Sequence, residues 1–254
     1  MIQADRIAAI LDTLGEQGSC SITRLAERFD VSEETIRRDV RQLEGRGQVI
    51  KVHGGVTLPA AQLEAPYRRR LRDQVEAKRA IATLAAGFVK DGSTVFIDSG
   101  TTSYWVAQEL AHLRDLSLVT NSLEVAVETL GRPDQRVFLA GGAMNVDYRS
   151  AFDADAIAYV RRFVPDVAVL SMGAIDAARG FLDFDPDEAA FKRAIMDCAR
   201  RLIVVADHAK FTRHGTVHVA DFAQVNDLVT ESEPPLAIRA AAIQAGTAIH
   251  VVGA

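Results

Sequence analysis

The sequence predicts two folded parts: an N-terminal winged helix-turn-helix and, after it, an α/β domain built on a largely parallel sheet. The first is indicated by two amphipathic helical segments that precede an arginine-rich helix at 31–43 and a short β-rich segment. The second is indicated by short apolar runs that alternate with helical patterns from Ser93 onward. With 254 residues, of which 48% are hydrophobic, the chain can bury a substantial core in one or two domains.

The first two helices are identified by the spacing of their apolar residues. The first carries them at i, i+3, i+4 and i+7 and ends between Gly15 and Gly18; its apolar residues are Ile7, Ile10, Leu11 and Leu14. The second is shorter, and its apolar face consists of Ile22, Leu25, Ala26 and Phe29. The turn Asp30-Val31-Ser32 then leads into the arginine-rich helix, which is the order of elements in a helix-turn-helix.

The arginine-rich helix has one apolar side and one cationic side. At about 100° per residue, Ile36, Val40 and Leu43 fall within a narrow arc. The basic side chains lie roughly 100° to 200° away from that arc: Arg37, Arg38 and Arg41. Ser32 is a favourable N-cap, and the glutamates after it place negative charge in the first turn, where the helix dipole favours it. The candidate DNA-contacting residues on the cationic side of this helix are Arg37, Arg38 and Arg41.

The segment QVIKVHGGV after Gly47 is typical of a wing, and it adds Lys51 and His53 to the candidate DNA contacts. Residues 37–53 contain five basic and two acidic side chains, a net charge of +3. The whole chain has 29 basic and 34 acidic residues, a net charge of −5. Although arginines on one helix could simply be solvated, the complete set of helices, turn and wing favours a specific double-stranded DNA binder.

A connecting segment is predicted after the wing. LPAAQLEAP lacks helical periodicity and is bounded by prolines. Residues 67–79 then carry six basic side chains, which fit either a solvated helix or a helix that touches the DNA backbone. Of these two interpretations, the solvated helix is favoured.

The α/β domain is predicted from seven apolar runs, with helical patterns between most of them: TVFID, LSLVTN, RVFLAGG, DVAVLSMG, RLIVVAD, VNDLVTE and TAIHVV. Polar or glycine clusters follow five of these runs, at the carboxyl ends where open α/β sheets bind ligands. The clusters are Asp98-Ser99-Gly100-Thr101-Thr102, Thr120-Asn121, Gly141-Gly142, Ser171-Met172-Gly173 and Asp207-His208-Ala209-Lys210. Their convergence at one sheet edge predicts a binding site.

The residue types in this predicted site favour a phosphorylated small molecule. Gly100 permits close backbone approach, and the hydroxyls of Thr101 and Thr102 accompany free N–H groups at a helix N-terminus, which suits an anion. Lys192 and Lys210 can add positive charge. Hydrogen bonds to the hydroxyls of a sugar or polyol can come from Asp98, Asn121 and Asp207. The alternative, that glycines and threonines merely turn strands into helices, would suffice for one cluster alone.

An ordered set of motifs resembles the DeoR family of bacterial transcription regulators. TIRRDVRQLEGRGQVIKVHGG is followed by IDSGTT, LVTN, LAGG and DHAKF, and the resemblance extends from Asp5 to about Pro235. It implies a winged helix-turn-helix fused to a sugar-phosphate sensor with a ribose-5-phosphate isomerase-like, Rossmann-like α/β fold. It also implies a repressor that its ligand releases. By the same resemblance, the DNA-contacting helix of the family corresponds to Ser32, Thr35, Arg37 and Arg38, and its phosphate loop corresponds to Gly100, Thr101 and Thr102. The expected bounds are 1–57 for the DNA-binding domain, 58–75 for the linker and connecting helix, and 76–254 for the effector domain.

Within that family, LDFD at 182–185, DHAKF at 207–211 and ESEPP at 231–235 look most like glycerol-3-phosphate repressors. Two features depart from the family pattern: Asp153 within RSAFDADA, and the turn Ser171-Met172-Gly173-Ala174. Either could reshape the pocket. Glycerol 3-phosphate is therefore the leading effector, and another polyol or sugar phosphate is the alternative.

The competing class is a sugar-phosphate isomerase-like enzyme, with acid and base groups supplied by Asp98, Asp176, Asp207 and Lys210. An isomerase needs no arginine-rich helix and wing, so a regulator without catalytic residues is preferred. No metal or other cofactor is expected, because Cys20 and Cys198 lie far apart and His214 and His218 fall in a loop-like segment. A cytoplasmic, membrane-free homo-oligomer, dimer or tetramer, is expected, since one winged domain contacts too little DNA for tight binding.

Overall fold

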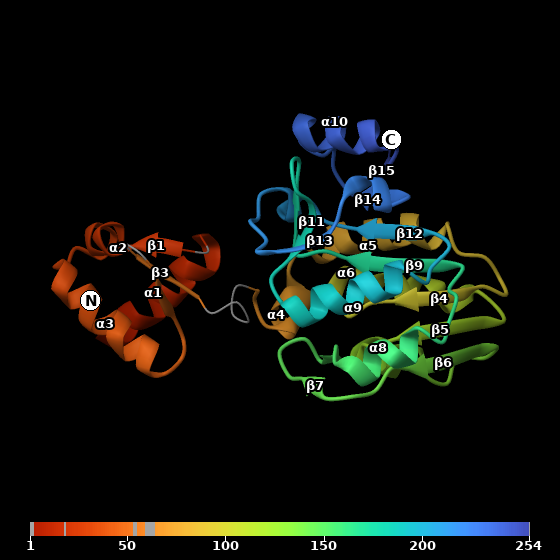
Figure 1. Ribbon diagram of the computed structural model, residues 1–254, viewed down its shortest axis with the longest axis horizontal. Helices are drawn as coiled ribbons and strands as arrows, with labels where there is room; N and C mark the ends of the chain where they lie inside the picture. The colour runs from red at the N-terminus through yellow and green to blue at the C-terminus, as the bar shows by residue number, and fades with distance from the viewer. Residues whose placement is uncertain (1–2, 18, 53–54, 59–63, 254) are drawn as a thin grey trace. The chain divides into compact units, whose positions relative to one another are not determined.

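The computed structural model describes residues 3–17, 19–52, 55–58 and 64–253. By its internal contacts the chain divides into two compact units, Met1–Pro66 and Tyr67–Ala254 (Figure 1). The predicted connecting segment, 58–75, crosses this division, and its helical part belongs to the second unit.

The first unit contains three helices and a three-stranded antiparallel sheet of order β1-β3-β2. Its elements are α1 (Gln3–Gln17), β1 (Ser19–Ser21), α2 (Ile22–Phe29), α3 (Glu33–Gly45), β2 (Ile50–Val52) and β3 (Gly55–Thr57). The three predicted helices and the wing are confirmed. Strand β1, which pairs with the wing strand β3, was not predicted because three residues with one apolar side chain show no pattern.

Helix α3 has the predicted buried side and N-cap. The side chains of Ile36, Val40 and Leu43 are fully buried in the core of the unit, and the Ser32 hydroxyl accepts a hydrogen bond from the Thr35 N–H at 3.2 Å. One buried residue was not predicted: Asp39 accepts a hydrogen bond from Arg6 Nε at 2.5 Å and so ties α3 to α1. The two polar faces of these helices are thus joined by an ion pair inside the unit.

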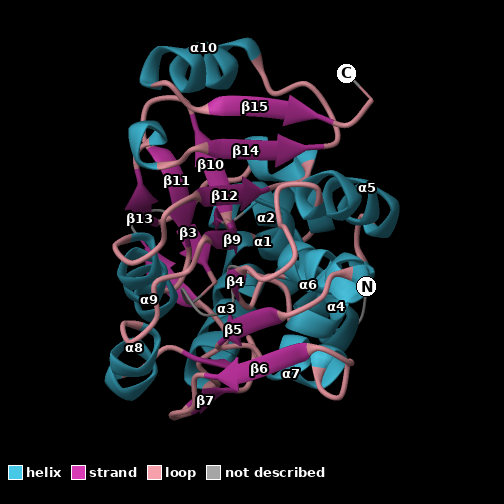
Figure 2. Cartoon of the chain, turned by 90° about the vertical axis from the view of Figure 1, so that its right-hand side faces the viewer, coloured by secondary structure: helices cyan, strands magenta, loops and turns pink. Residues whose placement is uncertain are grey.

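The second unit is built on a seven-stranded, fully parallel sheet of order β15-β14-β12-β9-β4-β5-β6, which Figure 2 shows from β15 to β6. The strands are β4 (Thr94–Ile97), β5 (Leu116–Thr120), β6 (Gln135–Leu139), β9 (Val167–Ser171), β12 (Leu202–Val205), β14 (Asp227–Thr230) and β15 (Ala248–Val251). Each of the seven predicted apolar runs is one of these strands.

Helices cover both faces of this sheet (Figure 1). On one face a buried cluster joins the sheet to α5 (Val75–Ala86), α6 (Thr101–Glu109) and α7 (Leu123–Thr129). On the other face a second cluster joins it to α8 (Ala154–Val160), α9 (Pro186–Met196) and α10 (Leu236–Ala245). Because both faces are covered, the central strands are apolar throughout, as the sequence indicated.

Short elements complete the second unit. They are α4 (Tyr67–Arg72), the hairpin β7 (Met144–Asn145) and β8 (Ser150–Ala151), the antiparallel strands β10 (Ala174–Asp176), β11 (Gly180–Asp183) and β13 (Val217–Ala220), and three 3₁₀ turns, η2 (Leu110–His112), η3 (His208–Phe211) and η4 (Phe222–Gln224). None of these strands was predicted, because they are short antiparallel pieces that lie outside the alternation of apolar runs and helical patterns.

The basic segment 67–79 is two helices rather than one. The chain turns at Gln74, which has a positive φ of 54°, between α4 and α5. The prediction of a solvated helix is right for most of the arginines, Arg68, Arg69, Arg72 and Arg79, which are exposed. It is wrong for Lys78, whose side chain is buried against the rest of the second unit.

The order of the strands defines where a ligand site should lie. From β4 the chain proceeds outward to β5 and β6, then returns to β9 on the other side of β4 and continues to β12, β14 and β15. The loops that leave β4 and β9 therefore run in opposite directions. Open α/β sheets bind ligands at this topological switch point, at the carboxyl ends of the strands.

None of the helices in the described ranges combines the length and the apolarity that crossing a bilayer requires. Both cysteines, Cys20 and Cys198, are free thiols. Within the same ranges, no group of three or more His, Cys, Asp and Glu side chains is placed to hold a metal ion.

Candidate functional site

The first unit presents its cationic side chains around a hollow of about 470 Å³ between α2, α3 and the wing. The hollow is lined by Ile22, Thr23, Arg37, Val40, Arg41, Lys51 and Gly55. Arg38 is exposed on the same helix, and the hydroxyls of Ser32 and Thr35 are hydrogen-bonded to each other at 2.9 Å. Of the predicted DNA contacts, only His53 lies outside the described residues. The structure thus brings the two predicted cationic elements to one surface, and their contact with DNA stays a prediction.

Three of these cations form ion pairs that the sequence reasoning did not predict. Arg37 Nη2 lies 3.0 Å from Glu33 Oε2, and Arg41 Nη2 lies 2.9 Å from Glu34 Oε1. The Lys51 ammonium pairs with Glu44. Each pair is exposed to solvent, so water screens it strongly. Arg38 has no such ion pair within the described part of the chain.

In the second unit, Asp98 lies at the switch point and joins the two loops that diverge there. Its Oδ1 accepts a hydrogen bond from Gly100 N at 3.0 Å, and its Oδ2 accepts one from Ser171 N at 2.8 Å. A Cβ on Gly100 would lie 1.5 Å from Ser171 Oγ. The sequence reasoning attributed Gly100 to close approach by a ligand, whereas in the structure the close approach is made by Ser171.

The start of α6 offers polar groups that lack partners. Gly100 is the N-cap, and the side chains of Thr101 and Thr102 are buried in the first turn. The buried hydroxyls of Ser99 and Ser103 have no hydrogen-bond partner among the described residues. A helix N-terminus with buried hydroxyls around it can bind an anion that carries hydroxyl groups.

Asn121, directly after β5, adds further buried polar groups to this sheet edge. Its Nδ2 donates a hydrogen bond to Ala151 O at 3.0 Å, which holds the β7–β8 hairpin against the sheet edge. Its Oδ1, and the buried hydroxyl of Ser150 on that hairpin, have no partner within the described ranges.

The Gly141-Gly142 loop after β6 is held by the residue that departs from the family pattern. Asp153 caps α8 by accepting a hydrogen bond from Ala156 N at 2.9 Å, and it accepts another from Ala143 N at 2.6 Å. These backbone hydrogen bonds lower the pKa of its carboxyl. Gly142 has φ 144°, and a Cβ there would lie 2.3 Å from Asp153 Oδ1. Asp153 therefore fixes this loop.

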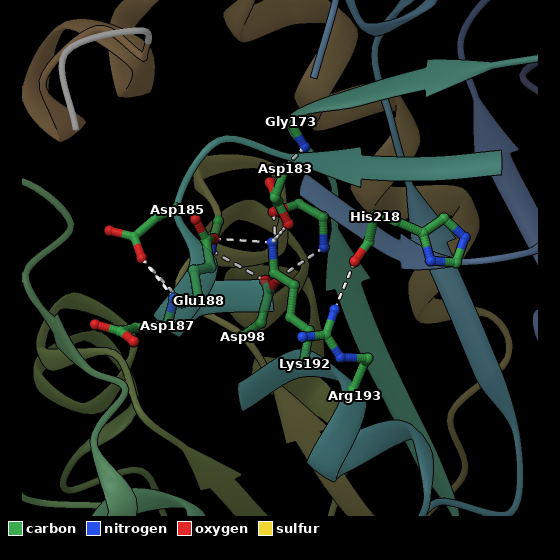
Figure 3. Close-up of polar contacts among 11 residues, drawn as sticks. Asp98, Gly173, Asp183, Asp185, Asp187, Glu188, Lys192, Arg193 and His218 are labelled. Carbon is green, nitrogen blue, oxygen red and sulfur yellow. Dashed lines mark hydrogen bonds and ion pairs between the residues drawn. The ribbon is translucent and has the colours of Figure 1, made fainter. Parts of the chain in front are cut away.

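Lys192 does not offer a free positive charge. Its ammonium lies 2.7 Å from Asp183 Oδ2, 2.8 Å from Glu188 Oε1 and 3.7 Å from Asp98 Oδ2, and its side chain is 2% exposed (Figure 3). Burial alone would lower the pKa of Lys192, but attraction to these carboxylates raises it well above its usual value. Asp183 also accepts a hydrogen bond from Gly173 N at 2.8 Å. The cluster thus connects α9 to the loops at the switch point.

Lys78 is the functional candidate that sequence reasoning missed. Burial lowers its pKa from the ordinary 10.5 to about 8, and its nearest charged groups include Asp207 and Lys210. Its ammonium donates a hydrogen bond to Arg70 O. Asp207 is buried at the carboxyl end of β12, where it caps η3 by accepting a hydrogen bond from Ala209 N at 3.1 Å. Only the fold could reveal Lys78, because it precedes the first strand of the sheet.

These features define a class of protein: a transcription regulator with a winged helix-turn-helix that binds DNA and a separate α/β unit whose sheet edge is polar. Two family models match the chain, the DeoR-like helix-turn-helix domain over residues 6–62 and the DeoR C terminal sensor domain over residues 73–232. The chain belongs to the DeoR family.

Similar proteins include several bacterial repressors. The chain is 34% identical over 238 residues to the glycerol-3-phosphate regulon repressor of Escherichia coli (strain K12), and the match covers 94% of each chain. It is 35% identical to the HTH-type transcriptional repressor CsqR of the same strain, covering 91% of this chain and 88% of CsqR. Identity to the transcriptional repressor AccR of Agrobacterium fabrum is 34%, covering 90% and 89%. The predicted family and the DNA-binding regulator class are confirmed.

One solved structure that resembles part of this chain is ribose 5-phosphate isomerase A from Methanocaldococcus jannaschii. The match has a TM-score of 0.40 and 14% sequence identity, and it covers 55% of this chain and 56% of that one.

Proposed function

We propose that this DeoR-family regulator represses a carbohydrate or polyol catabolic operon under the control of a phosphorylated sugar or polyol, with glycerol 3-phosphate as the leading candidate. The first unit binds the DNA operator and the second binds the effector. Support for this effector comes from the relative named a glycerol-3-phosphate regulon repressor and from the polar sheet edge of the second unit.

The observation that carries the effector proposal is the set of buried polar atoms without partners at this edge: Ser99 Oγ, Ser103 Oγ, Asn121 Oδ1 and Ser150 Oγ. A buried polar group that makes no hydrogen bond costs about 1 to 3 kcal/mol. Hydroxyl groups of a sugar or polyol would satisfy these atoms. The N-terminal turn of α6, beside Ser99 and Ser103, suits the phosphate.

The positive charge for a phosphate can also come from Lys78 and Lys210, near the end of β12. Strands β4 and β12 are two strand spacings apart, roughly 10 Å, which is within the reach of an extended sugar phosphate. Lys192 is unsuited to this role because three carboxylates surround it. A ligand that spans β4 and β12 would contact both ends of the site.

We infer that the effector is bound without turnover, in contrast to an isomerase-like enzyme. The relatives are named as repressors. Asp98, one of the acid and base candidates, is occupied by the two backbone N–H groups and by Lys192. Ribose 5-phosphate incubated with the protein should remain an aldose, as followed by NMR; conversion to the ketose would support the enzyme alternative.

The regulator would act in the cytoplasm as a homo-oligomer, dimer or tetramer, with two recognition helices in successive major grooves of the operator about one helical turn apart. To move the protein from a 99:1 to a 1:99 ratio of its DNA-binding and non-binding arrangements, the ligand must favour the non-binding arrangement by about 5.5 kcal/mol. Light scattering should report at least two chains per particle, and a monomer at micromolar concentration would contradict this part of the proposal.

Thermal unfolding against a panel of sugar and polyol phosphates tests the effector, because selective binding to the native state raises its stability. Glycerol 3-phosphate is expected to give the largest shift. Thr101→Ala should remove the shift and leave DNA binding intact, whereas Arg38→Ala should abolish DNA binding and leave the shift. If each substitution impaired both activities equally in folded protein, the assignment of one activity to each unit would be wrong.

A further inference from the structure

The DNA-facing surface is less basic than the count over residues 37–53 indicates. That count omits the first turn of α3, which contains Glu33 and Glu34. From residue 33 to residue 51 there are five basic and four acidic side chains, a net charge of +1. One of the acids, Asp39, is buried with Arg6 inside the unit and does not face DNA. The other three are exposed beside the cations.

The three exposed acids, Glu33, Glu34 and Glu44, have one feature in common: each is paired with a cation that lines the hollow. Glu33 also accepts a hydrogen bond from Thr23 Oγ1 at 2.6 Å, so it links α2 to α3 at the edge of the hollow. Hydrogen bonds from Thr23 and Arg37 lower the pKa of Glu33, so its carboxylate is ionised at neutral pH.

We propose that Glu33, Glu34 and Glu44 limit non-specific DNA binding by competing with backbone phosphates for Arg37, Arg41 and Lys51. This inference rests on DNA binding by the first unit. A phosphate that approaches any of these cations must displace the carboxylate that pairs with it. The displaced carboxylate remains close to the DNA, and its negative charge repels the phosphate. Random sequence offers nothing to offset this cost. A specific sequence offsets it through contacts with base edges, including those made by Arg38.

The expected size of the effect follows from the exposure of the pairs. The side chains of the three cations are 44% to 59% exposed, so each pair is screened and its loss changes phosphate affinity by only about two- to five-fold. All three together should therefore change non-specific affinity by about tenfold or more. Phosphate contacts made by freed cations also release counterions, which steepens the dependence of affinity on salt.

The test compares the unmodified protein with the triple variant E33Q/E34Q/E44Q. Two probes are used: a random-sequence duplex, and a duplex selected by the unmodified protein from a random pool. Binding is measured by fluorescence anisotropy from about 50 to 200 mM salt. We expect the triple variant to bind the random duplex about tenfold more tightly, with a steeper salt dependence. Affinity for the selected duplex should rise by a similar factor, because its phosphates meet the same cations, and the contacts with base edges that distinguish the two duplexes are unchanged.

Asp12→Asn is the matched control, because it removes one negative charge from an exposed position on α1 that does not line the hollow. It should leave the random-duplex affinity within about twofold of the unmodified value. The single variant E44Q changes a residue in the last turn of α3, away from the first turn that Glu33 and Glu34 stabilise. It should give a smaller change in the same direction even if the triple variant unfolds, which circular dichroism would report.

Two failures are distinguishable. If the unmodified protein selects no sequence and binds no duplex, DNA binding by the first unit is wrong. If it selects a sequence but E44Q and the triple variant bind the random duplex as the unmodified protein does, or more weakly, then the carboxylates do not compete with phosphate and the inference is overturned.

Discussion

Single atoms decide the geometry at the switch point of the sheet. Asp98 fixes the loops after β4 and β9 by accepting hydrogen bonds from Gly100 N and Ser171 N. Gly100 has an ordinary φ of −70°, so glycine is required there by space and not by backbone conformation. The neighbour that fills the space is the Ser171 side chain.

Gly100→Ala should therefore destabilise the protein by about 1 to 3 kcal/mol, measured by urea denaturation, because an added methyl group overlaps Ser171 Oγ. Adding Ser171→Gly in the same chain should recover most of the loss. The control is Gly141→Ala, since no atom lies within 4 Å of a Cβ built there. Equal destabilisation by Gly100→Ala with and without Ser171→Gly would show that another contact is responsible.

Lys78 gives effector binding a predictable dependence on pH. Burial lowers its pKa to about 8, so in the free protein the ammonium loses its proton above that pH. A bound phosphate favours the charged form, so the complex holds more protons than the free protein and affinity falls as pH rises. Titration calorimetry with the effector should show nearly constant affinity between about pH 7 and 7.5, where the phosphate is already mostly dianionic, and a decrease of up to about tenfold per pH unit above pH 8.

Two variants separate this effect from other titrations. Lys78→Met should bind the effector more weakly at neutral pH and should show no decrease above pH 8. Lys90→Met, at an exposed lysine in the same unit, should retain the full pH dependence. If Lys78→Met kept that dependence, the titrating group would lie elsewhere.

At the scale of the elements, α9 is anchored to the sheet by a buried charge cluster. Lys192 on α9 meets Asp98 after β4 and Asp183 on β11, so one ammonium connects three elements (Figure 3). Glu188, one turn earlier on α9, completes the cluster. The four groups carry more negative than positive charge, so the lysine is essential to their burial.

Lys192→Met should remove the ammonium that these buried carboxylates share and destabilise the protein by about 3 to 5 kcal/mol in urea denaturation. Lys90→Met, which removes an exposed lysine, should change stability by less than about 0.5 kcal/mol. A loss below about 1 kcal/mol for Lys192→Met would mean that the carboxylates take up protons or rearrange at little cost.

The elements also show how far sequence patterns reach. The seven strands of the large sheet were predictable because each is a short apolar run in an alternation with helical patterns, and five of the runs end in a polar or glycine cluster. The strands β10, β11 and β13 were not predicted, because they pair antiparallel in a separate small sheet and do not follow the alternation of strand and helix that marked the large one. The polar clusters around Asp98 and Asp207 were predicted at the correct sheet edge because they directly follow β4 and β12, two of the predicted strands.

Partners distant in sequence were beyond such reasoning. The sequence identified Lys192 as a lysine near the site, but nothing in its spacing indicated that Asp183 would neutralise it. Lys78 looked like one of six basic residues in a solvated helix, and only tertiary packing buries it. Similarly, Glu33 and Glu34 were identified as favourable charges in the first turn of α3, but their ion pairs with Arg37 and Arg41 were not predicted.

For the whole molecule, the division at residue 66 separates two hydrophobic cores. The first unit has its own buried cluster, and the second has two clusters, one on each face of its sheet. Helix α4 belongs to the second unit through Tyr67, which is buried and whose N–H donates to Asp147 O at 3.2 Å. A fragment that begins before Tyr67 therefore retains the complete second core.

Residues 64–254 alone should fold and should show the same effector-induced rise in melting temperature as the full chain, because every proposed effector contact lies in the second unit. Differential scanning calorimetry provides the measurement. A fragment that folds but no longer responds to the effector would show that the first unit contributes to the effector site.

The two cysteines give this molecule a natural means of selective labelling. Each unit contains one thiol: Cys20 is buried in the first, whereas Cys198 in the second is only partly covered. Burial raises the pKa of the Cys198 thiol, so alkylation should be slow at neutral pH and faster in mildly alkaline buffer. A maleimide fluorophore could therefore be attached to the second unit of the native chain without mutagenesis, and its emission could follow effector binding in real time.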